Sequence, residues 1–216
     1  MNKKVSLVIP YALCALAVCA LGLGAGFATA ADVGADAEHA ALQKTIETCA
    51  TCHGKNGRSI SPTFPNLAAQ TKPYLVAQLS AFRDQKRADP DAQAYMWGMA
   101  SQLTDSTIDS LADYFSAQPP IPPASHPANP ALVAQGKKLF DEGVPANGVP
   151  ACASCHGATA AGLTVFPRLA GQHAPYLYKQ LLVIQSVLRV APVMHGVIKD
   201  LTKDQMQAVV AYLASI

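Results

Sequence analysis

One short motif, two cysteines three positions apart followed at once by a histidine, occurs twice in this chain of 216 residues. The first copy lies at residues 49–54 (CATCHG) and the second at residues 152–157 (CASCHG). Each copy is followed by a related segment, FPNLAAQ at 64–70 and FPRLAGQ at 166–172, and then by Pro-Tyr-Leu. Self-similarity of this kind indicates one structural unit built twice. We therefore expect two related domains in tandem.

The spacing within the motif indicates its chemistry. Two cysteines three positions apart lie on one side of a helix, where their thiols can add to the two vinyl groups of one haem. The adjacent histidine then supplies an imidazole to the iron, and Cys-x-x-Cys-His is the signature of c-type haem attachment. The sequence predicts two covalently bound haem c groups, attached through Cys49, Cys52, Cys152 and Cys155, with His53 and His156 as iron ligands.

Two other uses of the cysteine pairs are less consistent with the sequence. Disulfides or thioredoxin-like redox sites would leave the histidine after both pairs unexplained, and the βαβ context of thioredoxin-like sites is not apparent. A zinc site would need a fourth ligand, usually from a second well-spaced pair, and none is near.

The sixth iron ligand separates a carrier from an enzyme, because a methionine thioether raises the reduction potential and leaves no open coordination position. Met96 and Met194 each stand seven residues before a matched leucine, Leu103 and Leu201. This equivalence within the repeat makes them the predicted sixth ligands.

Each half also contains a rival ligand. Met99 lies on the same short loop as Met96 but has no equivalent in the second half. His195, next to Met194, could ligate the iron and would give a much lower potential, although a pocket-lining or surface histidine is the more ordinary interpretation. His173 is expected to be a solvent-exposed or linker residue.

Other residues are candidates for the surroundings of the haem. The carbonyl of Pro65 or Pro167 could accept the N–H of the proximal imidazole and fix its orientation and basicity, whereas the alternative is a simple turn. Three aromatic residues have two possible roles. They line the haem pockets or contact the haem propionates, or else they belong to the ordinary hydrophobic core: Tyr74, Tyr176 and Trp97.

Apolar periodicity predicts an all-α fold. The last segment of each half places apolar residues at i, i+3, i+4 and i+7, and these face a core: Ile108, Leu111, Ala112 and Phe115, then Met206, Val209, Val210 and Leu213. Thr202 with Gln205 predicts a capping box, and Thr104 can cap the earlier helix. Helices also fit 73–83 and 175–188, and no alternating strand pattern is visible.

The remaining features divide the chain. Lys3 and Lys4 precede an apolar run that ends in Ala-Thr-Ala, which predicts a cleaved signal peptide at 1–30 and export to the periplasm. The run is also long enough to be an uncleaved anchor. The Pro-rich segment QPPIPP opens a linker at 118–127 that separates domains at 31–117 and 128–216.

Charge differs between the halves. Residues 31–117 contain seven basic and ten acidic residues, and residues 118–216 contain seven basic and four acidic ones. The acidic and basic ends would orient redox partners, and we expect the haem of the basic second half to have the higher potential. No basic patch suggests nucleic-acid binding.

Together these residues resemble the c4-type diheme cytochromes c, two class I cytochrome c folds in tandem. The resemblance implies a periplasmic carrier, often membrane-associated, that passes electrons from a quinol-oxidising complex or dehydrogenase to a terminal oxidase or reductase. It implies redox protein partners and no small-molecule substrate. The alternatives are a cytochrome subunit of a dehydrogenase complex and a diheme enzyme such as a peroxidase.

The second half departs from the pattern of this family. The matched glutamine precedes the predicted methionine ligand by 26 positions in the first half, from Gln70 to Met96, but by 22 in the second, from Gln172 to Met194. We therefore expect a shorter loop before Met194.

Overall fold

The computed structural model describes residues 30–123 and 129–216, with side chains described from residue 36. The predicted signal peptide at 1–30 therefore lies outside the described residues except at its last position, and the predicted linker at 118–127 is described only as far as residue 123. Within the described ranges the structure is helical. It contains two isolated β-bridges, and no strand in these ranges extends beyond a single bridge. The predicted all-α class is confirmed.

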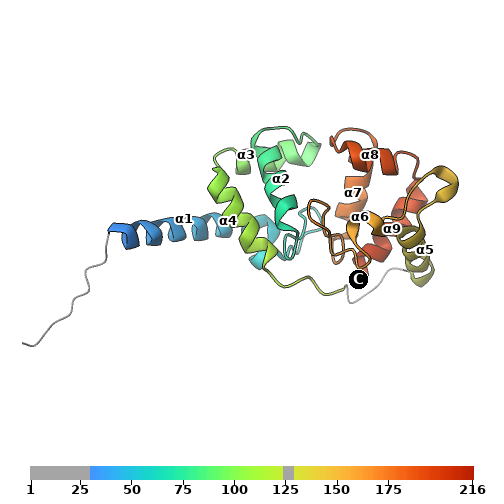
Figure 1. The fold of residues 1–216 in the computed structure, drawn as a ribbon, viewed down its shortest axis with the longest axis horizontal. Coiled ribbons are helices and arrows are strands. Elements are labelled where there is room, and N and C mark those ends of the chain that lie inside the picture. The colour runs from blue at the N-terminus through green and yellow to red at the C-terminus, as the bar shows by residue number, and fades with distance from the viewer. Residues whose placement is uncertain (1–29, 124–128) are drawn as a thin grey trace, which may run out of the picture.

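The two halves lie side by side (Figure 1). The first half contains α1 (Ala30–His53), η1 (Lys55–Gly57), α2 (Lys72–Arg83), a π-helical turn η2 (Ala92–Met96), α3 (Trp97–Ala100) and α4 (Asp105–Ser116). The second half contains α5 (Pro130–Glu142), η3 (Pro145–Asn147), α6 (Ala153–His156), α7 (Ala174–Gln185), α8 (Pro192–Ile198) and α9 (Lys203–Ala214).

The closing helices form as their periodicity predicts. All eight residues of the two predicted apolar faces are buried, and burial of side chains of this size stabilises the fold by about 1.5–3 kcal/mol for each large one. Thr202 and Gln205 make the predicted capping box at the start of α9. The Thr104 side chain accepts from the Thr107 N–H at the start of α4, as expected.

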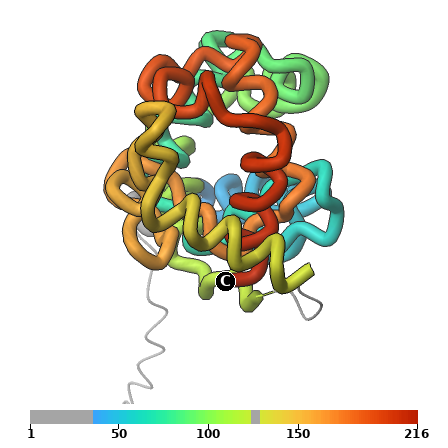
Figure 2. The backbone as a smooth tube through the Cα atoms, turned by 90° about the vertical axis from the view of Figure 1, so that its right-hand side faces the viewer, coloured from blue at the N-terminus to red at the C-terminus, as the bar shows by residue number. Residues whose placement is uncertain are grey.

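In the second half, α5 and α9 cross at very short range. A Cβ atom on Gly136 of α5 would lie 1.9 Å from the carbonyl oxygen of Ala208 in α9. Figure 2, which faces this half, shows α5 in yellow and α9 in red. The rings of Phe140 and Tyr212 lie 5.5 Å apart beside the crossing. Only glycine at position 136 permits this approach of the two backbones.

The first half packs its opening helix differently. Leu42, Ile46 and Cys49 of α1 pack against the core face of α4. The earlier part of α1 extends away from the domain (Figure 1). Because α1 runs without interruption into the first haem motif, this half has no counterpart of the turn between α5 and α6.

Two local features of the second half were not expected from the sequence. The helix predicted over 175–188 ends at Gln185, because Ser186 closes it and Val187 has a positive φ of 61°. Between α5 and α6 the chain turns at Gly143, where φ is 70° and a Cβ atom would lie 2.2 Å from the Val149 carbonyl. A β-bridge between Val144 and Val149 closes this turn.

Candidate haem-binding sites

The two cysteine motifs lie at equivalent places in the halves. Cys49, Cys52 and His53 occupy the C-terminal end of α1, while α6 contains Cys155 and His156 and begins just after Cys152. None of these four cysteines forms a disulfide. The motif therefore presents two thiols and one imidazole together on a helix in each half, as its spacing predicts.

The surroundings of the thiols do not favour the alternative uses. Burial raises the pKa of Cys49, and it raises the pKa of Cys152 to about 11. Reactive cysteines of disulfide exchange have lowered values instead. No group of three or more metal-binding His, Cys, Asp or Glu side chains occurs among the described residues, and a zinc site would need four ligands.

Each motif histidine is buried and oriented by a proline carbonyl. His53 and His156 are 7% and 6% exposed. The Nδ1 atom of His53 lies 2.9 Å from the Pro65 carbonyl oxygen, and Nδ1 of His156 lies 2.9 Å from that of Pro167. Burial lowers the pKa of both imidazoles. A neutral ring that donates through Nδ1 keeps the Nε2 lone pair for a metal ion.

A repeated aromatic contact holds each ring and was missed in the sequence. Phe64 meets His53 edge-on with ring centroids 6.1 Å apart, and Phe166 meets His156 in the same way at 6.2 Å. The signal was present, because a phenylalanine precedes the matched proline in both halves.

A cavity of about 220 Å³ joins Cys49 to the two candidate methionines of the first half. Met96, the last residue of η2, is half-buried and packs with Trp97 and Leu103 against Phe82, whereas Met99 is 49% exposed. The cavity is thus lined by the thiol of Cys49 and by thioether sulfur, and the imidazole of His53 belongs to the same motif as Cys49. This set of donors fits a covalently attached haem.

In the second half, Met194 lies on α8 and packs against the main core of that half. The rival ligand His195 has its Nδ1 atom 3.0 Å from the Ile184 carbonyl oxygen. The motif histidines His53 and His156 make the same kind of contact.

A buried polar cluster at the boundary of the halves was not predicted. Arg87 contacts Asp89 at 2.8 Å and Gln180 of the other half at 3.0 Å. Arg189 contacts Gln180 at 2.6 Å and reaches back to the Tyr74 hydroxyl at 2.8 Å. The signal was a repeated spacing, since an arginine follows a glutamine by nine positions in both halves, Gln78 to Arg87 and Gln180 to Arg189.

The charge of this cluster is not balanced by its side chains. The two guanidinium groups are buried, since Arg87 is 9% and Arg189 is 8% exposed. Among the side chains that they contact, one is a buried carboxylate, Asp89, which is 1% exposed. Buried charges are stable only when paired. The two carboxylates of a haem would supply negative charge there, so the excess of guanidinium groups also fits haem binding. Trp97 donates its indole N–H to the Arg87 carbonyl at 2.8 Å.

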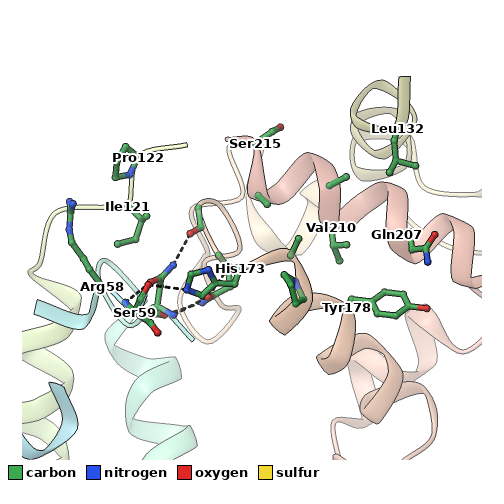
Figure 3. Close-up of a pocket in the computed structure, with 17 residues that line it drawn as sticks. Arg58, Ser59, Ile121, Pro122, Leu132, His173, Tyr178, Gln207, Val210 and Ser215 are labelled. Atoms are coloured by element: carbon green, nitrogen blue, oxygen red, sulfur yellow. Dashed lines mark hydrogen bonds between the residues drawn. The ribbon is translucent and has the colours of Figure 1, made fainter. Parts of the chain in front are cut away.

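A larger hollow of about 790 Å³ lies elsewhere, between the linker residues Ile121 and Pro122 and the helices α7 and α9 (Figure 3). None of the predicted haem-attaching or iron-ligating residues lines it. Because the cysteine, histidine and methionine donors gather elsewhere, we place the sites at the motifs rather than in this hollow.

Comparison with known proteins agrees with the two sites. The family model for cytochrome c matches residues 40–118 and again 133–216. The chain is 42% identical over 198 residues to cytochrome c-552 of Acidithiobacillus ferridurans, covering 91% of this chain and 85% of that protein. It is 35% identical to the thiosulfate dehydrogenase electron acceptor of Thiomonas intermedia, covering 84% of each.

A solved structure shares the whole two-domain arrangement. The cytochrome c4 structure of Acidithiobacillus ferrooxidans superposes with a TM-score of 0.74 at 42% identity, covering 78% of this chain and 98% of that one. The tandem match, the helical fold and this likeness agree with one another. The chain belongs to the cytochrome c family as a two-domain cytochrome of the c4 type, an electron-transfer protein with two covalently bound haem c groups.

Proposed function

We propose that this protein carries single electrons in the periplasm, from a quinol-oxidising complex or a dehydrogenase to a terminal oxidase or reductase. Cys49 and Cys52 attach one haem, and Cys152 and Cys155 attach the other. The iron ligands are His53 with Met96, and His156 with Met194. Iron held between an imidazole and a thioether exchanges electrons without an open position for a substrate.

The observation that carries the proposal is that each buried histidine presents a neutral imidazole beside a pair of cysteines that form no disulfide, once in each half. In the first half, the cavity that Cys49 lines also reaches Met96. The halves are joined by buried and partly buried hydrogen bonds, among them Arg87 to Gln180 at 3.0 Å and Arg189 to Gln78 at 2.9 Å. Two sites fixed within one body suit an electron that enters at one and leaves at the other.

The charges of the surface suit short-lived docking. The first half has an excess of acidic residues and the second an excess of basic ones. Complementary charge chiefly sets the orientation and rate of an encounter, and transient redox complexes use small interfaces. Among the described residues no helix combines the length and the hydropathy needed to cross a bilayer. The proposal includes peripheral association with a membrane.

A two-part experiment tests the proposal. Fractionation of cells should release the haem-stained protein with the periplasmic contents, and it should be reduced by a quinol-oxidising complex in rapid-mixing measurements. Oxidation by a terminal oxidase should follow, and both rates should fall as salt is added. Retention in the cytoplasm, or reduction that no respiratory donor accelerates, would contradict it.

A second candidate is an acceptor or subunit that works with one dehydrogenase. The relative named as a thiosulfate dehydrogenase electron acceptor favours it. A permanent subunit would be purified in a stable complex with its dehydrogenase. A dedicated acceptor would be reduced much faster by thiosulfate dehydrogenase with its substrate than by a quinol-oxidising complex. Comparison of the two donors under one set of conditions decides between the candidates.

A further inference from the structure

Two glutamines join the halves, each by two hydrogen bonds to the backbone of the other half. Oε1 of Gln172 accepts from the Asn66 N–H at 2.9 Å, and its Nε2 donates to the Asn66 carbonyl at 3.0 Å. Gln70 makes the same pair of bonds with Arg168, at 2.6 and 3.0 Å. Both glutamines are only 7% exposed. The contact is therefore buried, and it occurs twice with the roles of the halves exchanged.

The peptide groups held in this way are the ones that face the motif histidines. The carbonyl of Pro65, 2.9 Å from Nδ1 of His53, belongs to the same peptide group as the N–H of Asn66. The carbonyl of Pro167, 2.9 Å from Nδ1 of His156, likewise belongs to the peptide group of the Arg168 N–H. A single peptide group thus connects the histidine of one half to the glutamine of the other.

Electronic coupling along this connection follows from the structure of the peptide. Because the C–N bond has partial double-bond character, a hydrogen bond at the N–H makes the carbonyl oxygen a better acceptor. Hydrogen bonds in a chain strengthen one another in this way. A stronger acceptor at Nδ1 raises the basicity of an imidazole ligand, and a more basic ligand favours the oxidised state of the metal.

We propose that Gln172 tunes His53, and that Gln70 tunes His156, so that each glutamine lowers the reduction potential of the haem in the opposite half. Both are positioning residues that act through a proline carbonyl. This inference rests on the proposed function, in which His53 and His156 ligate the irons. It assigns a redox role to two buried amides that otherwise serve to join the halves.

The test replaces each glutamine with methionine, which has a similar length but can make neither hydrogen bond. A redox titration followed by NMR resolves the two haems. Gln172→Met should raise the equilibrium constant for reduction of the first-half haem by roughly two- to five-fold, and leave the second-half haem unchanged. Gln70→Met should do the reverse. In the reduced protein, the Nδ1 proton resonance of the affected histidine should move upfield.

A matched control removes a different contact between the halves. Nε2 of His173 lies 3.1 Å from the Ser59 carbonyl (Figure 3), and His173→Phe removes this contact without altering either proline peptide group. This variant should leave both potentials and both Nδ1 resonances in place. If it shifts them as much as Gln172→Met does, or if Gln172→Met shifts both haems equally or neither, the inference is wrong.

The unaltered protein provides a second test, which holds even if a variant fails to fold. The amides of Asn66 and Arg168 should exchange with solvent more slowly in the oxidised than in the reduced protein. The adjacent amides of Leu67 and Leu169 donate at 2.8 Å to carbonyls of their own halves, and should show a smaller change. An equal change for all four amides would overturn the inference. Failure of the proposed function is seen separately, as a spectrum without histidine-ligated haem.

Discussion

Replacement of Gly136 by alanine should strongly destabilise the second half. The added Cβ atom would lie 1.9 Å from the Ala208 carbonyl oxygen, 2.5 Å from its carbonyl carbon and 2.9 Å from Cβ of Tyr212. Non-bonded heavy atoms pack best at about 3.5–4.0 Å, so α5 and α9 must separate by about 1.5 Å at their crossing. Two of the three obstructing atoms are backbone, which cannot turn aside as a flexible side chain can.

The size of the effect follows from two opposing terms. Alanine is favoured over glycine within a helix by roughly 0.5–1 kcal/mol. Overpacking costs about 1–3 kcal/mol and sometimes more, and a gap of about 1 Å forfeits a quarter to a half of each neighbouring contact. Leu139, Phe140 and Val209 are buried on these two helices. We expect the packing term to win, with a net loss of about 3 kcal/mol.

Thermal unfolding followed by far-ultraviolet circular dichroism measures this loss. For a domain of this size, about 3 kcal/mol should lower the midpoint of the second half by roughly 12–24 °C. Gly196→Ala is the control, because Gly196 lies within α8 and a Cβ atom there would meet nothing within 4 Å. It should leave the midpoint unchanged or raise it slightly. Equal midpoints for Gly136→Ala and the unaltered protein would refute the reasoning.

Four further outcomes are expected. Met96→Ala should abolish the near-infrared band of one haem and open that iron to added ligands, whereas Met99→Ala should leave the spectrum intact. Asp89→Asn, which removes a carboxylate that is 1% exposed and 2.8 Å from Arg87, should raise the potential of the first-half haem in a redox titration. Thr202→Ala should destabilise α9 by about 1 kcal/mol in denaturant unfolding, through loss of its capping box. Potentials resolved by NMR should place the second-half haem above the first, and the opposite order would contradict the expected effect of its excess of basic residues.

Much of the fold could be predicted because its signals are local. The closing helices repeat an apolar face, and the caps at Thr104 and Thr202 depend on residues three positions away. The motif cysteines and histidines are adjacent in sequence, so their grouping needs no knowledge of the tertiary structure. The break between α5 and α6 was missed because Gly143 and Pro145 act within a segment that has no periodicity.

The contacts between the halves could not be predicted from the same signals. Glutamine and arginine are usually exposed, but Gln70, Gln172, Arg87 and Arg189 are buried, and each makes a hydrogen bond to the other half. The expectation that His173 is a solvent-exposed or linker residue was wrong, since this half-buried residue occupies the N-cap position of α7 and its ring reaches the Ser59 carbonyl of the first half. A repeat indicates which residues are equivalent, but not which surfaces of the two units meet.

The assignment of two irons, each held between a histidine and a methionine, is tested most directly by absorption spectroscopy of the purified protein with its haem quantified. The account predicts two thioether-linked haems in each chain and, in the oxidised protein, a near-infrared Met-to-iron band of two-haem intensity. A chain with one haem or none, or a high-spin spectrum without that band, would contradict it.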